Sequence, residues 1–257
     1  MSYALALRSY EFWLAFYKRT WRGSLATSIV NPVFYLGALG VGLGTLVNRA
    51  GTTPGGVDYL AFVAPGVLAA TAMQVGTTEA SWPVLGSIRW TRVYYAMLAT
   101  PLGIGDIVVG HQLWMATRVA TSSAVYLAVI AAFGGIQSPL AVLALPACVL
   151  IGVAFAGPMA AYAATRERDG AFVPVMRFGI VPMFLFSGTF FPISRLPVVL
   201  EWVARATPLW HGVDLCRGLT LGTITWSSAV VHVAYLLVWA VGGVALAFST
   251  YRRRLLK

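Results

Sequence analysis

The sequence predicts an all-α membrane protein with six transmembrane helices, within a single domain that covers residues 1–257. Hydrophobic residues make up 59% of the chain and charged residues 10%, and the mean hydropathy is +0.78, more apolar surface than a soluble domain of this length can bury. A helix needs about 20 apolar residues to cross a bilayer. Six stretches approach this length: Ser24–Val47, Leu60–Ala80, Ile107–Phe133, Leu140–Ala163, Phe172–Phe191 and Trp226–Ser249. Barrel strands would be shorter and would alternate, so we expect helices to span the membrane.

The net charge of +10 is arranged as in a membrane protein rather than a nucleic-acid-binding one. With both termini in the cytoplasm, the inner segments hold 12 lysines and arginines and the outer segments 4, and Arg118 and Arg177 lie near the membrane. Basic residues concentrate on the cytoplasmic side of membrane proteins. We therefore expect both termini in the cytoplasm, an inner surface in contact with anionic membrane lipid, and no nucleic-acid partner.

Residues 3–22 predict a helix that lies in the inner membrane interface. Five large apolar residues fall on one helical stripe, and the basic residues fall mostly elsewhere; the stripe is Tyr10, Trp13, Leu14, Tyr17 and Trp21. Aromatic bulk beside basic side chains is typical of interfacial helices. An ordinary cytosolic extension is the alternative. The first span then begins after Gly23, and Asn31-Pro32 should kink it or mark its true start.

The segment 84–106 is predicted to connect the second and third spans in the cytoplasm. Residues from Thr91 to Ala99 can form a short amphipathic helix, which Thr100-Pro101 would end because proline disfavours a helical residue before it. This helix would expose Tyr94, Tyr95, Met97 and Leu98 at the inner surface, where a soluble partner can dock. A plain connecting loop with interfacial tyrosines is the alternative.

The segment 192–225 is predicted to form a re-entrant helical hairpin on the outer side, before the last span. Four prolines divide this region into pieces too short to span: Pro182, Pro192, Pro197 and Pro208. Short helices near Leu196–Arg205 and Leu209–Leu219 would dip into the outer leaflet and return. Broken backbone is tolerated at that depth only when it is buried in protein or lines a wet cavity. The alternative is an exposed loop that rests on the interface.

Glu79 and Arg118 are the clearest charges near or within the spans, and such charges are functional candidates because burying them is costly. A structural pair of Glu79 with Arg118 or with Arg89 is favoured over a proton relay. The histidines have no carboxylate at ligand spacing, so we predict no metal site. We also predict no catalytic and no cofactor-binding residue in this chain.

Two stretches of the chain resemble a known family. Met97-Leu-Ala-Thr-Pro-Leu102 follows the second span, and Phe186-Ser-Gly-Thr-Phe-Phe-Pro192 precedes Leu196-Pro197 and Pro208-Leu-Trp-His211. In order and spacing they resemble the ABC-2 family of transporter permeases over essentially the whole chain. Within that family they are similar to the nodulation-factor and lipooligosaccharide exporters, and the drug-exporting permeases are near relatives.

The resemblance implies a permease of the bacterial inner membrane, formed by two copies of this chain or by one copy and a close paralogue. Two copies of an ATP-hydrolysing subunit would serve it and would bind the ATP and Mg. The cytoplasmic helix would receive the motion of that subunit through Thr91, Tyr94, Tyr95, Met97, Leu98 and Pro101. The cargo would be a glycolipid, a lipid-linked oligosaccharide or an amphiphilic drug.

The resemblance also implies a transport path between the two copies, along spans 1, 2 and 5. Glycines from Gly37 to Gly44 would permit close helix approach at this seam. Several residues are candidates to line the exit: Phe184, Phe186, Ser187, Gly188, Phe190, Phe191 and Trp210. Their aromatic rings would slide past sugar rings or lipid chains. Simple packing of these rings is the alternative.

The motor for ATP-driven transport must lie outside this chain. A phosphate-binding P-loop needs a glycine-rich backbone and a lysine just before serine or threonine. Lys18 and Lys257 are the only lysines, and neither lies in such a loop. Three rival functions remain: a secondary transporter driven by an ion gradient, a membrane enzyme acting on lipid-linked sugars, and a structural subunit. The first would need acidic residues deep in the spans, and the second a cluster of acids or histidines at one membrane face.

Overall fold

The computed structural model describes residues 3–51, 53 and 56–256, and among them it contains helices and no strand. This confirms the predicted all-α class. The α-helices are α1 (Tyr3–Tyr35), α2 (Gly44–Arg49), α3 (Tyr59–Glu79), α4 (Trp82–Arg89), α5 (Val93–Leu98), α6 (Ile104–Ala132), α7 (Ala144–Ala164), α8 (Phe172–Val175), α9 (Val181–Phe186), α10 (Val198–Arg205), α11 (Pro208–Leu221) and α12 (Trp226–Leu255). Lys257, counted above with the inner basic residues, lies outside the described residues.

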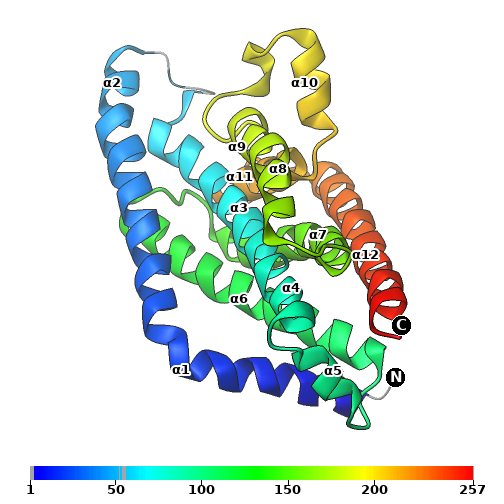
Figure 1. The fold of residues 1–257 in the computed structure, drawn as a ribbon. Coiled ribbons are helices and arrows are strands. Elements are labelled where there is room, and N and C mark those ends of the chain that lie inside the picture. Colours follow the sequence, from blue (N-terminus) through cyan, green and yellow to red (C-terminus); the bar gives the residue numbers. More distant parts are fainter. Residues whose placement is uncertain (1–2, 52, 54–55, 257) are drawn as a thin grey trace.

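The long helices form a bundle in which α7 packs against α12, α3 and α6. Helix α1 begins and α12 ends at one end of this bundle, where α5 also lies (Figure 1). We call it the terminal end. Helices α2 and α10 lie at the opposite end, which we call the far end.

Six helical segments of the described chain are long and apolar enough to cross a membrane, which confirms the predicted number. They are Val30–Arg49, Tyr59–Arg89, Ile104–Ala132, Pro139–Ala164, Asp169–Phe186 and Trp226–Leu255. The second extends beyond its predicted end at Ala80, because α4 follows α3 toward the terminal end after a short break (Figure 1). Glu79 is the last residue of α3 and lies ten residues before the end of this candidate segment.

Helix α1 is continuous where the sequence predicted two elements. It passes through Gly23 without a break, first across the terminal end and then along the side of the bundle (Figure 1). Pro32 lies inside it, and the candidate span begins at Val30. After Pro32 the backbone widens into a π-helical stretch, Leu36–Leu43, a local irregularity that is frequent at functional sites. That the first part of α1 lies in the membrane interface stays a prediction.

Glycine pairs set the closest contacts of α7. A Cβ atom on Gly76 of α3 would lie 2.4 Å from the carbonyl oxygen of Gly152, and one on Gly157 would lie 2.7 Å from the carbonyl carbon of Gly243 in α12. Only residues without a side chain permit this backbone approach, which is how membrane helices gain packing energy in the absence of a hydrophobic effect. Helix α7 is thereby fixed between α3 and α12.

The fifth span is shorter and less regular than predicted. It was expected to reach Phe191, but its helix ends at Phe186. It consists of α8, the π-helical stretch Met176–Ile180 and α9, with proline at positions 174 and 182. Each proline removes a backbone donor and crowds the carbonyl four residues earlier, which disturbs the α-helical ladder. The following residues up to Phe191 form a loop.

The two short helices expected in the segment 192–225 are α10 and α11, close to the expected bounds. Helix α10 leaves Val198, Val199 and Trp202 largely exposed, at 69%, 74% and 69%. Helix α11 is instead buried in the bundle, where it packs against α3, α12 and α7. The alternative of an exposed loop therefore does not hold for α11. The dip of the hairpin into the outer leaflet stays a prediction.

Candidate transport and coupling site

Helix α5, the centre of the predicted coupling segment, is tucked into the terminal end of the bundle. It spans Val93–Leu98, shorter than the expected Thr91–Ala99. The expectation that both Tyr94 and Met97 are exposed is wrong, because they are 0% and 7% exposed. Successive helical residues point about 100° apart, so a short helix on a surface must turn some of its apolar residues inward.

Tyr94 joins α5 to three other helices. Its hydroxyl lies 2.5 Å from Nδ1 of His111 in α6 and 3.3 Å from the hydroxyl of Tyr251 in α12. The imidazole of His111 stacks on the indole of Trp13 in α1, with ring centroids 3.9 Å apart. Burial raises the pKa of Tyr94 well above its usual value, so the phenol stays neutral. A displacement of α5 must therefore disturb α1, α6 and α12 together.

The other predicted coupling residues face outward. Thr91, Tyr95 and Pro101 are exposed, and Leu98 is partly buried. Arg92, just before α5, has a φ of 52°, a left-handed conformation that is uncommon outside glycine. This turn separates the direction of α5 from that of α4.

A basic hollow adjoins the exposed side of α5. It has a volume of about 500 Å³ and is lined by Ile88, Arg89, Arg92, Tyr95 and Arg254. Glu167 is bound by Arg89 at 2.9 Å and also by Arg254, whose hydrogen bond and charge lower the pKa of that carboxyl. Three arginines against one carboxylate leave the hollow positively charged, which suits an acidic partner surface.

Several of the residues proposed for the exit lie together at the far end, but not all are exposed. Phe184 and Phe190 form an edge-to-face pair with centroids 5.0 Å apart, and Phe186 is 43% exposed. Ser187 and Gly188 are buried, and the Ser187 hydroxyl lies 3.0 Å from that of Thr207. Ser187 and Gly188 therefore pack inside the loop, which fits the alternative of simple packing better than a role in lining the exit.

Arg217 of α11 is hydrogen-bonded to the loop that follows α9, a contact that was not predicted from the sequence. Its guanidinium donates to the carbonyl of Phe62 at 3.0 Å and to the carbonyl of Gly188 at 2.7 Å, and it lies over the Phe62 ring. Burial lowers its pKa to about 10, so it still carries its charge at neutral pH. The close packing of this loop on Gly66, where a Cβ would lie 2.7 Å from the Thr189 oxygen, requires glycine.

Two histidines, His211 of α11 and His232 of α12, are hydrogen-bonded to each other at the far end. Nδ1 of His211 lies 2.9 Å from Nδ1 of His232, and Nε2 of His232 lies 3.0 Å from Oδ2 of Asp214. Asp214, His232 and His211 therefore form one hydrogen-bonded chain between α11 and α12. No group of three or more potential ligands that could hold a metal occurs among the described residues.

Glu79 and Arg118 form an ion pair, one of the two pairings considered from the sequence. Nε of Arg118 lies 3.0 Å from Oε1 of Glu79, and Nη1 donates to the Tyr17 hydroxyl at 2.9 Å. The guanidinium also lies over the Tyr17 ring, 4.6 Å from its centroid. Arg89, the other possible partner, binds Glu167 instead. The pair links α1, α3 and α6.

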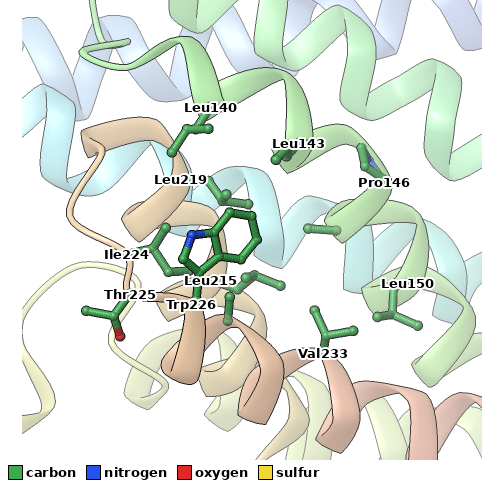
Figure 2. Close-up of a pocket in the computed structure, with 12 residues that line it drawn as sticks. Leu140, Leu143, Pro146, Leu150, Leu215, Leu219, Ile224, Thr225, Trp226 and Val233 are labelled. Atoms are coloured by element: carbon green, nitrogen blue, oxygen red, sulfur yellow. The ribbon is translucent and has the colours of Figure 1, made fainter.

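An apolar hollow opens at the far end between the start of α7, α11 and the start of α12. Its volume is about 340 Å³, and its lining is almost entirely hydrocarbon. Figure 2 shows Trp226 between Leu140 and Leu143 on one side and Val233 on the other. Such a hollow can accept a chain of methylene groups but offers few hydrogen bonds.

A family model described as ABC-2 type transporter matches residues 10–221, from α1 to the end of α11. The chain belongs to the ABC-2 type transporter family. It is therefore a transmembrane subunit of an ABC transporter and a multi-pass bacterial membrane protein. ABC-2 permeases generally pair with a separate ATP-binding subunit.

Relatives of this ABC-2 permease are named Nodulation protein J. The protein of Rhizobium leguminosarum bv. trifolii is 36% identical over 252 residues, which cover 95% of this chain and 94% of that protein. The proteins of Rhizobium meliloti and Bradyrhizobium diazoefficiens are each 32% identical, again over 95% of this chain and 94% of theirs. No solved structure matches the permease significantly.

Proposed function

We propose that this chain is the permease of an ATP-driven exporter, with both termini in the cytoplasm. Two copies, or one copy and a close paralogue, would work with two copies of an ATP-hydrolysing subunit. That subunit would bind ATP and Mg, since neither lysine of this chain lies in a P-loop. The inner excess of basic residues supports this orientation, which puts the terminal end in the cytoplasm.

The observation that carries the proposal is the position of Tyr94. It is buried among α1, α6 and α12, while Tyr95 on the same short helix is 40% exposed. An ATPase subunit that binds the exposed side of α5 and displaces this helix would therefore also displace Tyr94, whose side chain contacts three other helices. This gives a binding event outside the membrane a direct mechanical route into the bundle. The basic hollow beside Tyr95 adds an electrostatic contact for the same partner.

We propose an amphipathic cargo, such as a glycolipid, a lipid-linked oligosaccharide or an amphiphilic drug. The apolar hollow of about 340 Å³ at the far end would accept hydrocarbon chains. The exposed ring of Phe186, at the end of α9, would offer a surface to sugar rings or lipid chains. The similarity to proteins named Nodulation protein J favours the glycolipid class but is an association and not a physical argument.

The test is to purify the tagged chain from its own host membranes in mild detergent, identify what accompanies it and assay ATP hydrolysis. We expect a stoichiometric partner with a P-loop, in a complex of two permease and two ATPase chains by native mass spectrometry. Tyr95→Asp should release this partner, because it places a charge on the exposed apolar side of α5. Trp202→Asp is the matched control, since it puts the same charge on an exposed aromatic residue at the far end.

If the chain purifies without a P-loop protein and moves solute in liposomes under an ion gradient, the secondary-transporter function replaces this one. If it purifies alone and turns over lipid-linked sugars, it is a membrane enzyme. Release of the partner by Trp202→Asp but not by Tyr95→Asp would place the docking surface at the far end and contradict the proposed orientation.

A further inference from the structure

Helix α3 is buried on every side except one polar stripe. Sixteen of its residues are buried, and those that remain are Thr71, Gln74, Val75, Thr78 and Glu79. Their spacing of three and four residues puts them on one face of the helix. All five line the same cleft, which has a volume of about 250 Å³. The most enclosed span of this bundle therefore has a single open face, and that face is polar.

This stripe lies in the middle of a candidate membrane span. Gln74 lies halfway along the candidate span Tyr59–Arg89, and Arg118 lies halfway along Ile104–Ala132. Amide and hydroxyl groups that face lipid hydrocarbon without partners are unfavourable by several kcal/mol each. A permease that exposes Gln74 and Thr78 there does so toward water or toward a polar ligand and not toward lipid.

The opposite walls of the cleft are polar as well. Helix α1 contributes Asn31 and Pro32, and α6 contributes Arg118 and Ser122. The guanidinium of Arg118 is paired with Glu79 at 3.0 Å, and the two side chains are only 11% and 21% exposed. The charges cancel within the pair, so the cleft presents amide and hydroxyl groups around a neutral ion pair. This chemistry suits an uncharged ligand with many hydroxyl or amide groups.

We infer that this cleft between α1, α3 and α6 binds the neutral glycan head group of the exported molecule at mid-membrane. The inference rests on the proposed function, because it assigns a subsite to the cargo. Gln74 and Asn31 supply both donors and acceptors, and Thr78 supplies a hydroxyl. The position differs from the predicted exit residues at the far end, so the cleft acts before the cargo reaches them.

The test uses two fluorescent probes with the same dodecyl chain, one with a maltose head and one with a phosphocholine head. Both are titrated against the purified chain in nanodiscs. Gln74→Leu and Thr78→Val should each weaken maltoside binding about fivefold, the factor that corresponds to about 1 kcal/mol per hydrogen bond. Neither should change phosphocholine binding, and Thr78→Ser should restore the affinity for maltoside.

Thr121→Val is the matched control. Thr121 is an exposed threonine on α6 that donates to the carbonyl of Arg118 and lies outside the cleft lining, so its variant should bind both probes like the parent. A thiol-reactive dye checks the fold of every variant, because Cys148 and Cys216 are both buried and react only on unfolding.

Two outcomes overturn the inference. One is a folded chain in which the Gln74 and Thr78 variants bind the maltoside as the parent does, or in which the parent does not bind it. The other is a high yield of cross-links between copies with Gln74→Cys, which would mean that a second copy closes the cleft. If a P-loop partner still accompanies the chain, only the subsite is wrong. If none does, the proposed function itself fails.

Discussion

The hydroxyl of Tyr94 lies 2.5 Å from Nδ1 of His111, inside a cluster that also holds Trp13 and Tyr251. Helix α5 is thus bound to the membrane helices by a hydrogen bond as well as by packing. Buried hydrogen bonds are directional and are costly to break, so this contact ties the position of α5 to that of α6. The proposed coupling through α5 depends on this hydrogen bond between α5 and α6.

Tyr94→Phe should destabilise the chain by about 1–2 kcal/mol, because it leaves Nδ1 of a buried histidine without this partner. Thermal unfolding followed by the reactivity of Cys148 and Cys216 measures the loss. Tyr95→Phe is the control and should be nearly neutral, since Tyr95 is 40% exposed. Equal effects of the two variants would mean that the Tyr94 hydroxyl contributes nothing.

Glu79→Gln and Arg118→Met should each destabilise the chain by about 3 kcal/mol, because each leaves the remaining partner of a largely buried pair uncompensated. The double variant should be less destabilised than the sum of the single ones. Unfolding in a denaturing detergent titration provides the double-mutant cycle.

The control for this cycle is the exposed pair of Glu201 and Arg205 in α10, which lie four residues apart. Removing either partner there should change stability by about 0.5 kcal/mol or less. Strict additivity at Glu79 and Arg118 would show that the ion pair carries no coupling energy.

The chain should become less stable in acid because of His211. Burial and the neighbouring His232 lower the pKa of His211 to about 4, whereas the unfolded chain takes up that proton near pH 6.5. The unfolded state therefore binds more protons between these values, so stability falls as the pH falls from about 6.5 toward 4. Asp214 adds to this at still lower pH, because its hydrogen bond to His232 lowers its pKa.

His211→Asn should flatten the fall in melting temperature between about pH 6.5 and 5, since asparagine can still form a hydrogen bond with His232 but does not titrate. Ser228→Ala is the control: it removes a hydroxyl 3.0 Å from Nε2 of His232 but no titrating group at His211. It should leave the pH dependence in place. A His211→Asn variant with the slope of the parent would assign the acid sensitivity to other groups.

Arg217→Lys should destabilise the loop after α9 by about 2 kcal/mol. Lysine keeps the charge but has no planar fork, so it cannot donate to the carbonyls of Phe62 and Gly188 together. Limited proteolysis between α9 and α10 would report the loosened loop. Arg195→Lys is the control because Arg195 is exposed, and it should leave the digestion pattern unchanged.

The spans and the helices between them could be predicted from the sequence, because length and hydropathy alone decide which segments can cross a bilayer. The sequence also paired Glu79 with Arg118 as one of two possibilities. It could not tell Tyr94 from Tyr95. Both are tyrosines on one short amphipathic helix, and only the packing of α5 on α6 and α12 brings Tyr94 against His111 and Tyr251.

The far-end contacts could not be predicted for a related reason. His211 and His232 lie on different helices, and only the packing of α11 on α12 brings their Nδ1 atoms within 2.9 Å. Arg217 meets the carbonyl of Phe62 only because α11 is packed into the bundle against α3. The early end of the fifth span at Phe186 was hidden because the loop that follows carries two more phenylalanines, Phe190 and Phe191.

The most direct test of the account is a cross-link between α5 and the ATP-hydrolysing partner. Tyr95→Cys and, at the far end, Val199→Cys both give exposed thiols, while Cys148 and Cys216 stay buried. A short bifunctional thiol reagent applied to native membranes should join the Tyr95→Cys permease to a P-loop subunit and leave the Val199→Cys permease unjoined. Cross-links to such a subunit from Val199→Cys alone, or from neither position in a folded chain, would contradict coupling through α5.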